Sequence, residues 1–129
     1  MTLVDTSVWI DLLNGPLGST VTEAELLNFA TCGPIVQEVL RGLPDGPASG
    51  AVREGLLALP VLSDPLPTAL FVSAAEIYHL GRAKGYTIRS STDCLIAAIA
   101  IENGVPVWHK DRDFEAIARY TSLRTRRMS

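Results

Sequence analysis

One stretch decides the fold: Leu3-Val4-Asp5-Thr6-Ser7-Val8-Trp9-Ile10, in which a buried strand ends at an acid and a helix begins at once. Leu3 and Val4 are typical of a central strand, and the apolar residues after Asp5 have the spacing of an amphipathic helix. In open parallel α/β sheets, ligands bind beyond the carboxyl ends of the strands. We therefore expect Asp5 to present its carboxylate at the edge of the sheet where such folds keep their active sites.

Strands and helices alternate along the rest of the chain. Turn, cap and periodicity signals predict strands near residues 3–4, 30–32, 60–62, 105–108 and 122–124 and helices over 6–13, from 22, 34–42, 51–59, 68–84, 91–103 and from 111. The run Cys94–Ile101 is apolar throughout and suggests a strand, but its alanines and the stop at Glu102-Asn103-Gly104 favour a buried helix in the middle of the molecule. The helix over 68–84 is also expected to be largely buried. This alternation predicts one domain over residues 1–129, a three-layer α/β/α sandwich around a mainly parallel sheet.

Composition sets the class of protein. The chain has 129 residues, of which 47% are hydrophobic and 19% charged, so a globular fold with a proper core is expected. No apolar run reaches the roughly 18 residues of a membrane span, and no basic leader precedes the first apolar segment. Cys32 and Cys94 lie in apolar contexts, which is typical of buried thiols rather than of disulfides or a zinc site. A cytoplasmic protein without a membrane partner is therefore expected.

Charge is distributed unevenly along the chain. Residues 1–79 hold two basic side chains and nine acidic ones, whereas residues 80–129 hold nine basic side chains and five acidic ones. A basic rim beside an acidic, metal-neutralised centre would suit a phosphate-rich substrate. The alternative is that the basic residues form a solvated tail.

Three aspartates stand at predicted helix starts: Asp5, Asp93 and Asp111. Each could simply cap its helix, because an aspartate in the first turn accepts backbone N–H groups and complements the helix dipole. Their order along the chain also brings them together. Asp5 and Asp111 each follow an apolar strand, and Asp93 opens the buried helix that leads into the second of these strands. The pattern therefore predicts an acidic cluster at one edge of the sheet.

Such a cluster implies a cation, because crowded carboxylates raise one another's pKa values unless a positive charge neutralises them. Oxygen ligands without histidine or cysteine favour Mg²⁺ or Mn²⁺ over zinc. Glu38 lies close to the apolar side of its helix, although taken alone it is typical of a surface glutamate. The hydroxyl groups that could hydrogen-bond a metal-bound water, or merely cap their helices, are those of Thr6, Ser7 and Ser91.

The two histidines do not suggest a different chemistry. We expect His79 to be a core residue of the helix over 68–84 and His109 to lie in a loop. The spacing shows no Ser/His/Asp arrangement, no GxGxxG and no GxxxxGK[ST].

Four motifs resemble, in order and over nearly the whole chain, the acidic motifs of PIN-domain ribonucleases: Val4-Asp5-Thr6-Ser7, Glu38 before Val39-Leu40-Arg41-Gly42, Asp93-Cys94-Leu95-Ile96-Ala97-Ala98, and Asp111-Arg112-Asp113-Phe114. Length and motif context are most similar to the VapC toxins of bacterial toxin–antitoxin pairs. The resemblance implies an endoribonuclease that uses Mg²⁺ or Mn²⁺ to cleave structured RNA, such as transfer RNA or a ribosomal RNA loop. It implies an acidic catalytic quartet and one variable extra metal ligand, namely Asp5, Glu38, Asp93 and Asp111, with Asp113 as the extra ligand.

The resemblance also implies partners. Members of the family are generally homodimers, and each is inhibited by a small antitoxin whose C-terminal segment fills the acidic groove. On the first two helices, the apolar residues expected to be exposed and to contact the antitoxin are Trp9, Leu12, Leu26 and Phe29.

Other functions remain open. A signalling receiver domain would need adjacent acids after its first strand and a phospho-acceptor aspartate with a later lysine, and neither pattern occurs. A housekeeping PIN nuclease in RNA processing, or a non-catalytic binding module whose acids are helix caps, would have the same sequence features.

Overall fold

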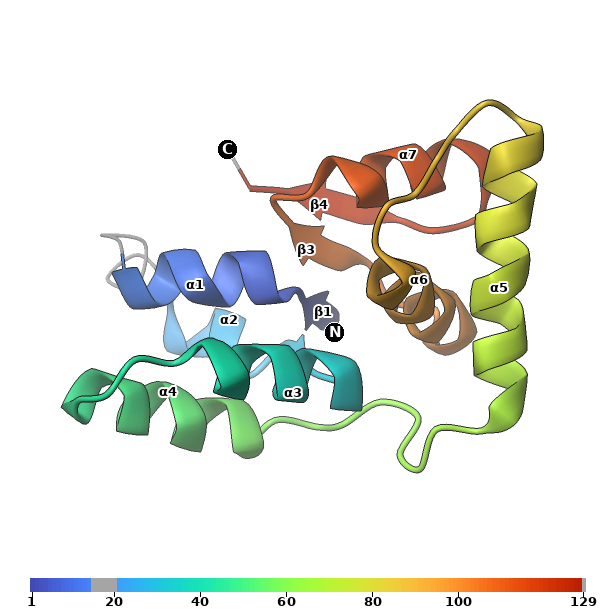
Figure 1. The fold of residues 1–129 in the computed structure, drawn as a ribbon. Helices are drawn as coiled ribbons and strands as arrows, with labels where there is room; N and C mark the ends of the chain where they lie inside the picture. The colour runs from blue at the N-terminus through green and yellow to red at the C-terminus, as the bar shows by residue number, and fades with distance from the viewer. Residues whose placement is uncertain (15–20, 129) are drawn as a thin grey trace.

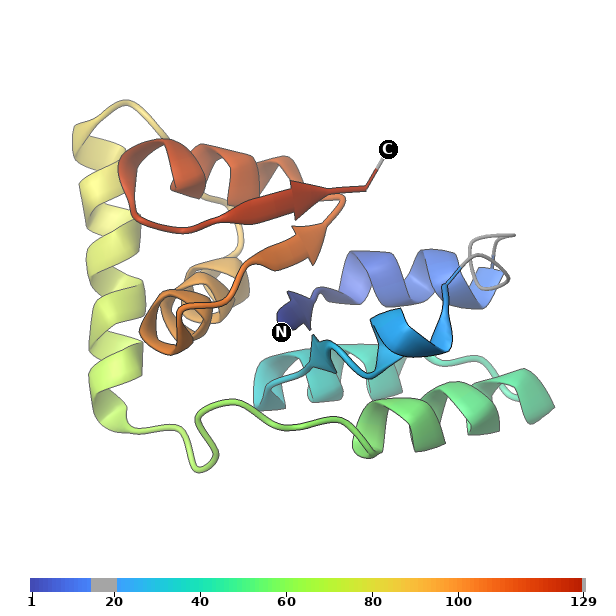
Figure 2. The same cartoon turned by 180° about the vertical axis from the view of Figure 1, so that it is seen from behind.

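The structure is a computed structural model that describes residues 1–14 and 21–128 (Figures 1 and 2). Its elements, in chain order, are β1 (Thr2–Val4), α1 (Thr6–Asn14), α2 (Glu23–Leu26), β2 (Phe29–Ala30), α3 (Gly33–Gly42), α4 (Pro47–Leu57), α5 (Thr68–Ala83), α6 (Ser91–Asn103), β3 (Val107–His109), α7 (Arg112–Tyr120) and β4 (Thr125–Arg127). The four strands of the described chain form one parallel sheet in the order β2-β1-β3-β4. Helices flank this sheet, which confirms the predicted α/β class.

The sheet divides the helices into two groups. Figure 1 shows α1 to α4 gathered beside β1 and β2, whereas α5, α6 and α7 lie beside β3 and β4. Figure 2 shows from behind that α5 stands at one end of the molecule, against α6 and α7. No helix in the described ranges is long and apolar enough to cross a bilayer.

The opening stretch folds as its sequence predicts. Leu3 and Val4 are fully buried in β1, which pairs with β2 on one side and β3 on the other. Asp5 ends the strand: its N–H donates to the carbonyl oxygen of Trp108 over 3.0 Å, and its own carbonyl accepts the first bond of α1, from Val8, over 3.0 Å. Since β1 and β3 are parallel neighbours, their carboxyl ends lie side by side.

The most apolar segment is a helix, as predicted, and it is the most deeply buried one among the described residues. The α6 helix has its N-cap at Ser90, whose hydroxyl accepts the Asp93 N–H over 3.2 Å, and its C-cap at Gly104, which has φ 65°. Cys94 is almost fully buried within α6, and Cys32 is fully buried before α3. Burial raises the pKa of the Cys32 thiol to about 12 and that of Cys94 to about 11, so both remain protonated.

The prediction that the helix over 68–84 is largely buried was wrong. Only one stripe of α5 is buried, formed by Leu70, Ala74, Ile77 and Gly81, because α6 occupies the centre and α5 packs outside it. On the outer side of α5, the exposed side chains include Phe71, Val72 and Leu80. His79 is also exposed, so its prediction as a core residue was wrong.

Three local boundaries also differ from the sequence prediction. The α4 helix begins at Pro47, inside a segment expected to be a loop, because proline is well suited to the first turn of a helix. The strand expected at 60–62 is only an isolated bridge between Thr31 and Val61. The last edge strand lies at Thr125–Arg127 instead of 122–124.

Candidate active site

Three carboxylates meet where α6 and α7 begin. Asp93 lies in the first turn of α6, Asp111 is the N-cap of α7, and Asp113 lies in the first turn of α7. Each offers one oxygen, and these three oxygens all lie within 4.8 Å of one another. We call these three residues the acidic cluster. Its members are also caps, since Asp111 Oδ1 accepts the Asp113 N–H over 2.9 Å.

Two further acids border the acidic cluster. Asp5 is 5% exposed, and its pKa is raised by burial and, to a lesser extent, by repulsion from Asp111, against hydrogen bonds from Ser7. Glu38 is half-buried on α3, and its pKa is raised by burial and by repulsion from Asp5. The acids that the sequence singled out therefore lie near one another, from Glu38 through Asp5 to the cluster.

Asp93 has the least stable charge of these acids. Burial, followed by hydrogen bonding and repulsion from Asp111 and by weaker repulsion from Asp5 and Asp113, raises the pKa of Asp93 to about 9. Its Oδ2 atom is buried and has no hydrogen-bond partner. A buried carboxylate oxygen without a partner is costly unless a proton or a cation neutralises it.

The donor set fits a hard divalent cation. All the converging groups are carboxylate oxygens, which suit Mg²⁺ and Mn²⁺, whereas structural zinc sites use thiolate and imidazole. The unpartnered Asp93 Oδ2 is the atom that such an ion would satisfy. Asp93, Asp111 and Asp113 could hold it directly, with Asp5 beside them.

The three hydroxyl residues have different surroundings. Ser7 Oγ donates to Asp5 Oδ2 over 2.6 Å and accepts the Lys110 N–H over 3.0 Å, so it fixes Asp5 against the end of β3. Thr6 Oγ1 is buried without a partner. Ser91 is exposed, and the N-cap of α6 is its neighbour Ser90.

Sequence reasoning missed the role of His109. It was expected in a loop, but it is fully buried at the end of β3. Its Nδ1 accepts the Asp111 N–H over 3.1 Å, which leaves the ring proton on Nε2, and Nε2 donates to Glu115 Oε1 over 2.8 Å. The same Glu115 oxygen accepts from Thr125 Oγ1 over 2.9 Å. The only signal in the sequence was a glutamate in the first turn of the helix after a strand-ending histidine.

Replacing His109 with alanine is expected to destabilise the protein by about 2–4 kcal/mol, because it leaves a cavity and removes two buried hydrogen bonds. Urea denaturation measures this change. Since the ring holds the turn that carries Asp111, the affinity for Mn²⁺ should also fall, which titration calorimetry of the folded variant can record. Wild-type stability together with wild-type Mn²⁺ affinity would contradict this positioning role.

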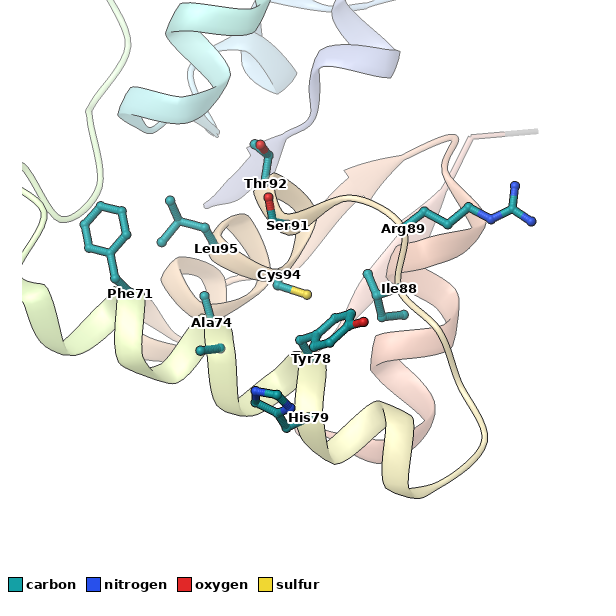
Figure 3. A pocket seen from close by; sticks show the side chains of 11 residues that line it. Phe71, Ala74, Tyr78, His79, Ile88, Arg89, Ser91, Thr92, Cys94 and Leu95 are labelled. Carbon is teal, nitrogen blue, oxygen red and sulfur yellow. The ribbon is translucent and has the colours of Figure 1, made fainter.

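Hollows surround the acids on several sides. One of about 520 Å³ lies between α5 and the start of α6, and Figure 3 shows Phe71, Tyr78 and His79 along it. A second, also of about 520 Å³, is lined by Glu38 and shares Thr92 with the first. A third, of about 470 Å³, is lined by Asp113. An extended ligand could therefore cross the acids in more than one direction.

Comparison with known proteins gives one family and consistent relatives. Residues 2–120 match the family model of the PIN domain. The chain is 37% identical over 130 residues to ribonuclease VapC11 of Mycobacterium tuberculosis, covering 95% of this chain and 96% of that protein.

Solved structures agree with this match at the level of the fold. VapBC-5 of Mycobacterium tuberculosis, a member of the VapBC family of toxin–antitoxin systems, aligns with a TM-score of 0.72 and 22% identity over 98% of each chain. VapBC2 of Rickettsia felis, bound to a DNA fragment from its promoter, aligns with a TM-score of 0.71 and 14% identity over 99% of this chain and 98% of that one.

Proposed function

Since this chain belongs to the PIN-domain family, we propose that it is a Mg²⁺- or Mn²⁺-dependent endoribonuclease and the toxin of a VapBC-type toxin–antitoxin pair. The observation that carries the proposal is the acidic cluster of Asp93, Asp111 and Asp113 beside Asp5, with one buried oxygen of Asp93 left without a partner. The proposed substrate is structured RNA, either transfer RNA or a ribosomal RNA loop.

The acids have distinct roles in the proposed mechanism. Asp93, Asp111 and Asp113 would hold the cation, and Asp5, fixed by Ser7, would complete the negative surface around it. When bound, a divalent cation lowers the pKa of a water molecule and offsets the charge that develops on the phosphodiester. Glu38 borders this centre and is half-buried, so we assign it the proton of the attacking water. In-line attack with departure of the 3′ oxygen would give a 5′-phosphate and a 3′-hydroxyl.

An apolar hollow supports the proposal of an antitoxin partner. It measures about 350 Å³ and is lined by residues of α1 and α4 and by residues in and just before α2, namely Trp9, Leu12, Val21, Leu26, Ala51, Val52 and Gly55. Three of the four predicted contact residues line it. Phe29 does not: it is 2% exposed and packs between the rings of Trp9 and Trp108, so its prediction as an exposed contact was wrong. Trp9 is also mostly buried, at 6% exposed.

A homodimer remains part of the proposal. The exposed apolar side chains of α5, among them Phe71 and Val72, offer a surface that a second copy could cover. Sedimentation equilibrium of the purified toxin would decide between monomer and dimer.

Expression in a bacterial host tests the whole proposal. Growth should stop on induction, recover when the adjacent small gene is co-expressed, and leave RNA fragments that mapping can place. The purified protein should cleave the same RNA with Mn²⁺ or Mg²⁺ and not in excess EDTA. Cleavage without growth arrest would favour a housekeeping nuclease, and absence of Mn²⁺ binding by calorimetry would favour the binding module.

The antitoxin surface has its own matched pair of variants. Leu26→Asp places a charge in the apolar hollow and should weaken antitoxin binding at least about tenfold, because a buried charge there loses its hydration. Leu27→Asp is the control, since Leu27 is 81% exposed and does not line the hollow. Equal binding by the two variants in a pull-down titration would move the antitoxin contact elsewhere.

A further inference from the structure

Four arginines line one hollow beside the acidic cluster. Arg89 comes from the loop before α6, Arg112 and Arg119 from α7, and Arg127 from β4, and the hollow measures about 470 Å³. Figure 3 shows the Arg89 side chain extending away from the aromatic pocket of α5 and α6. We call the hollow between these four side chains the arginine groove.

The arginine groove is continuous with the acidic cluster. Asp113 belongs to both, because it lines the groove and one of its oxygens lies within 4.8 Å of those of Asp93 and Asp111. The Arg89 N–H donates to Asp113 Oδ2 over 3.2 Å, which ties the loop wall of the groove to the same carboxylate. A ligand that reaches the cluster can therefore continue into the groove.

The positive charge of the groove is not consumed by neighbouring acids. Within residues 1–14 and 21–128, the ion pairs are His109–Glu115 and Lys110–Asp11, and neither includes a groove arginine. Glu115 also lines the groove, but its Oε1 accepts from His109 and Thr125. The four guanidinium groups are exposed and available to a ligand.

The alternation of β4 separates Arg127 from the arginine beside it. Arg126 lies over the ring of Trp108, 4.2 Å from its centroid. Since successive side chains of a strand point to opposite faces, Arg127 points the other way, toward the groove that it lines. The basic end of the chain is therefore divided between a packing arginine and a groove arginine, which a solvated tail would not require.

We propose that the arginine groove binds consecutive phosphates of the RNA strand on one side of the bond that the acidic cluster cleaves. This inference rests on the proposed function. Guanidinium groups form paired hydrogen bonds with phosphate oxygens and remain charged at any physiological pH. A groove of such groups that begins at a cation-holding carboxylate matches a polyanion whose scissile phosphate lies on the cation. Tyr86, stacked on Tyr120, lines the same groove and offers a ring edge to a ribose or base.

Binding without cleavage tests this assignment. The probe is a labelled single-stranded oligouridylate of about 12 nucleotides, titrated by fluorescence anisotropy in EDTA. The double variant Arg119→Ala/Arg127→Ala should bind it about tenfold to a hundredfold more weakly than wild type. Because each lost phosphate contact releases fewer counterions, the slope of log affinity against log salt should fall by about 1.4. Thermal melting of the double variant checks that the fold is retained.

Arg53→Ala is the matched control, because Arg53 is an exposed arginine on α4 and lines none of the hollows around the acids. It should bind the oligouridylate as wild type does. Equal affinity and equal salt slope for the control and the double variant would overturn the assignment. Retained RNA binding with loss of antitoxin binding would also overturn it, and would give the groove to an acidic protein segment. If wild type does not cleave RNA, the proposed function fails, whereas the binding comparison still reports on the groove.

Discussion

Replacing Asp93 with asparagine is expected to lower the rate of RNA cleavage by about three orders of magnitude while the fold is retained. The amide has the size of the carboxylate but no negative charge, so it cannot neutralise a cation. Asp93 is also the acid whose Oδ2 has no other partner in the described structure, which makes it the group whose loss nothing else replaces. The measurement is kcat/KM on a fixed RNA with Mn²⁺ in excess.

The control for this variant is Asp45→Asn. Asp45 is an exposed aspartate in the loop before α4, so the same chemical change there should leave cleavage unchanged. Both proteins should have far-ultraviolet circular dichroism like that of wild type. Full activity of Asp93→Asn would exclude the acidic cluster as the catalytic centre.

The metal-free protein is expected to lose stability as the pH rises from 5 to 9. The folded-state pKa of Asp93 is raised to about 9 from an ordinary value of 3.8, first by burial and then by Asp111. A group with a raised folded pKa contributes stability that is complete below its unfolded pKa and is lost as the pH passes through the folded pKa. Asp5 and Glu38 are shifted in the same direction, also first by burial.

The size of this effect makes it measurable by thermal melting in EDTA. We expect a loss of at least about 2 kcal/mol, or roughly 5–10 °C in Tm, between pH 5 and pH 9. Glu115 does not offset it, because hydrogen bonds from Thr125 and His109 lower its pKa, and its contribution is lost only as the pH falls into the acid range. Mn²⁺ should restore the Tm most strongly at high pH.

Asp93→Asn provides the control for the pH series. Its metal-free Tm should vary less between pH 5 and pH 9 and should exceed that of wild type at pH 8, because the largest unfavourable charge is gone. A wild-type Tm that stayed constant or rose over this range in EDTA would show that the acids are not crowded in solution.

The same carboxylate thus opposes stability and is required for the proposed activity. Removing the charge of Asp93 should make the empty protein more stable and the enzyme inactive. A residue that only capped α6 would behave differently, since its replacement would lower stability and leave cleavage intact. These two experiments therefore separate the nuclease from a binding module with capping acids.

The sequence determined the parts of this protein that depend on local order. The strand-to-helix change at Asp5, the buried α6 helix and the helix starts at Asp93 and Asp111 follow from apolar runs, caps and stops along the chain. In a parallel sheet these local signals also predict a shared edge, because neighbouring strands all end on the same side. The convergence of the acids was therefore predictable before any coordinates.

The tertiary structure decided which distant segments cover each residue. Phe29 and His109 are buried because rings and strands from elsewhere in the chain lie over them, whereas the outer face of α5 is exposed because α6 took the central position. The arginine groove likewise exists only because β4 pairs with β3 in a register that places Arg127 beside α7. Periodicity gives the faces of a helix or strand, but burial and charge clustering depend on packing between segments that sequence order does not fix.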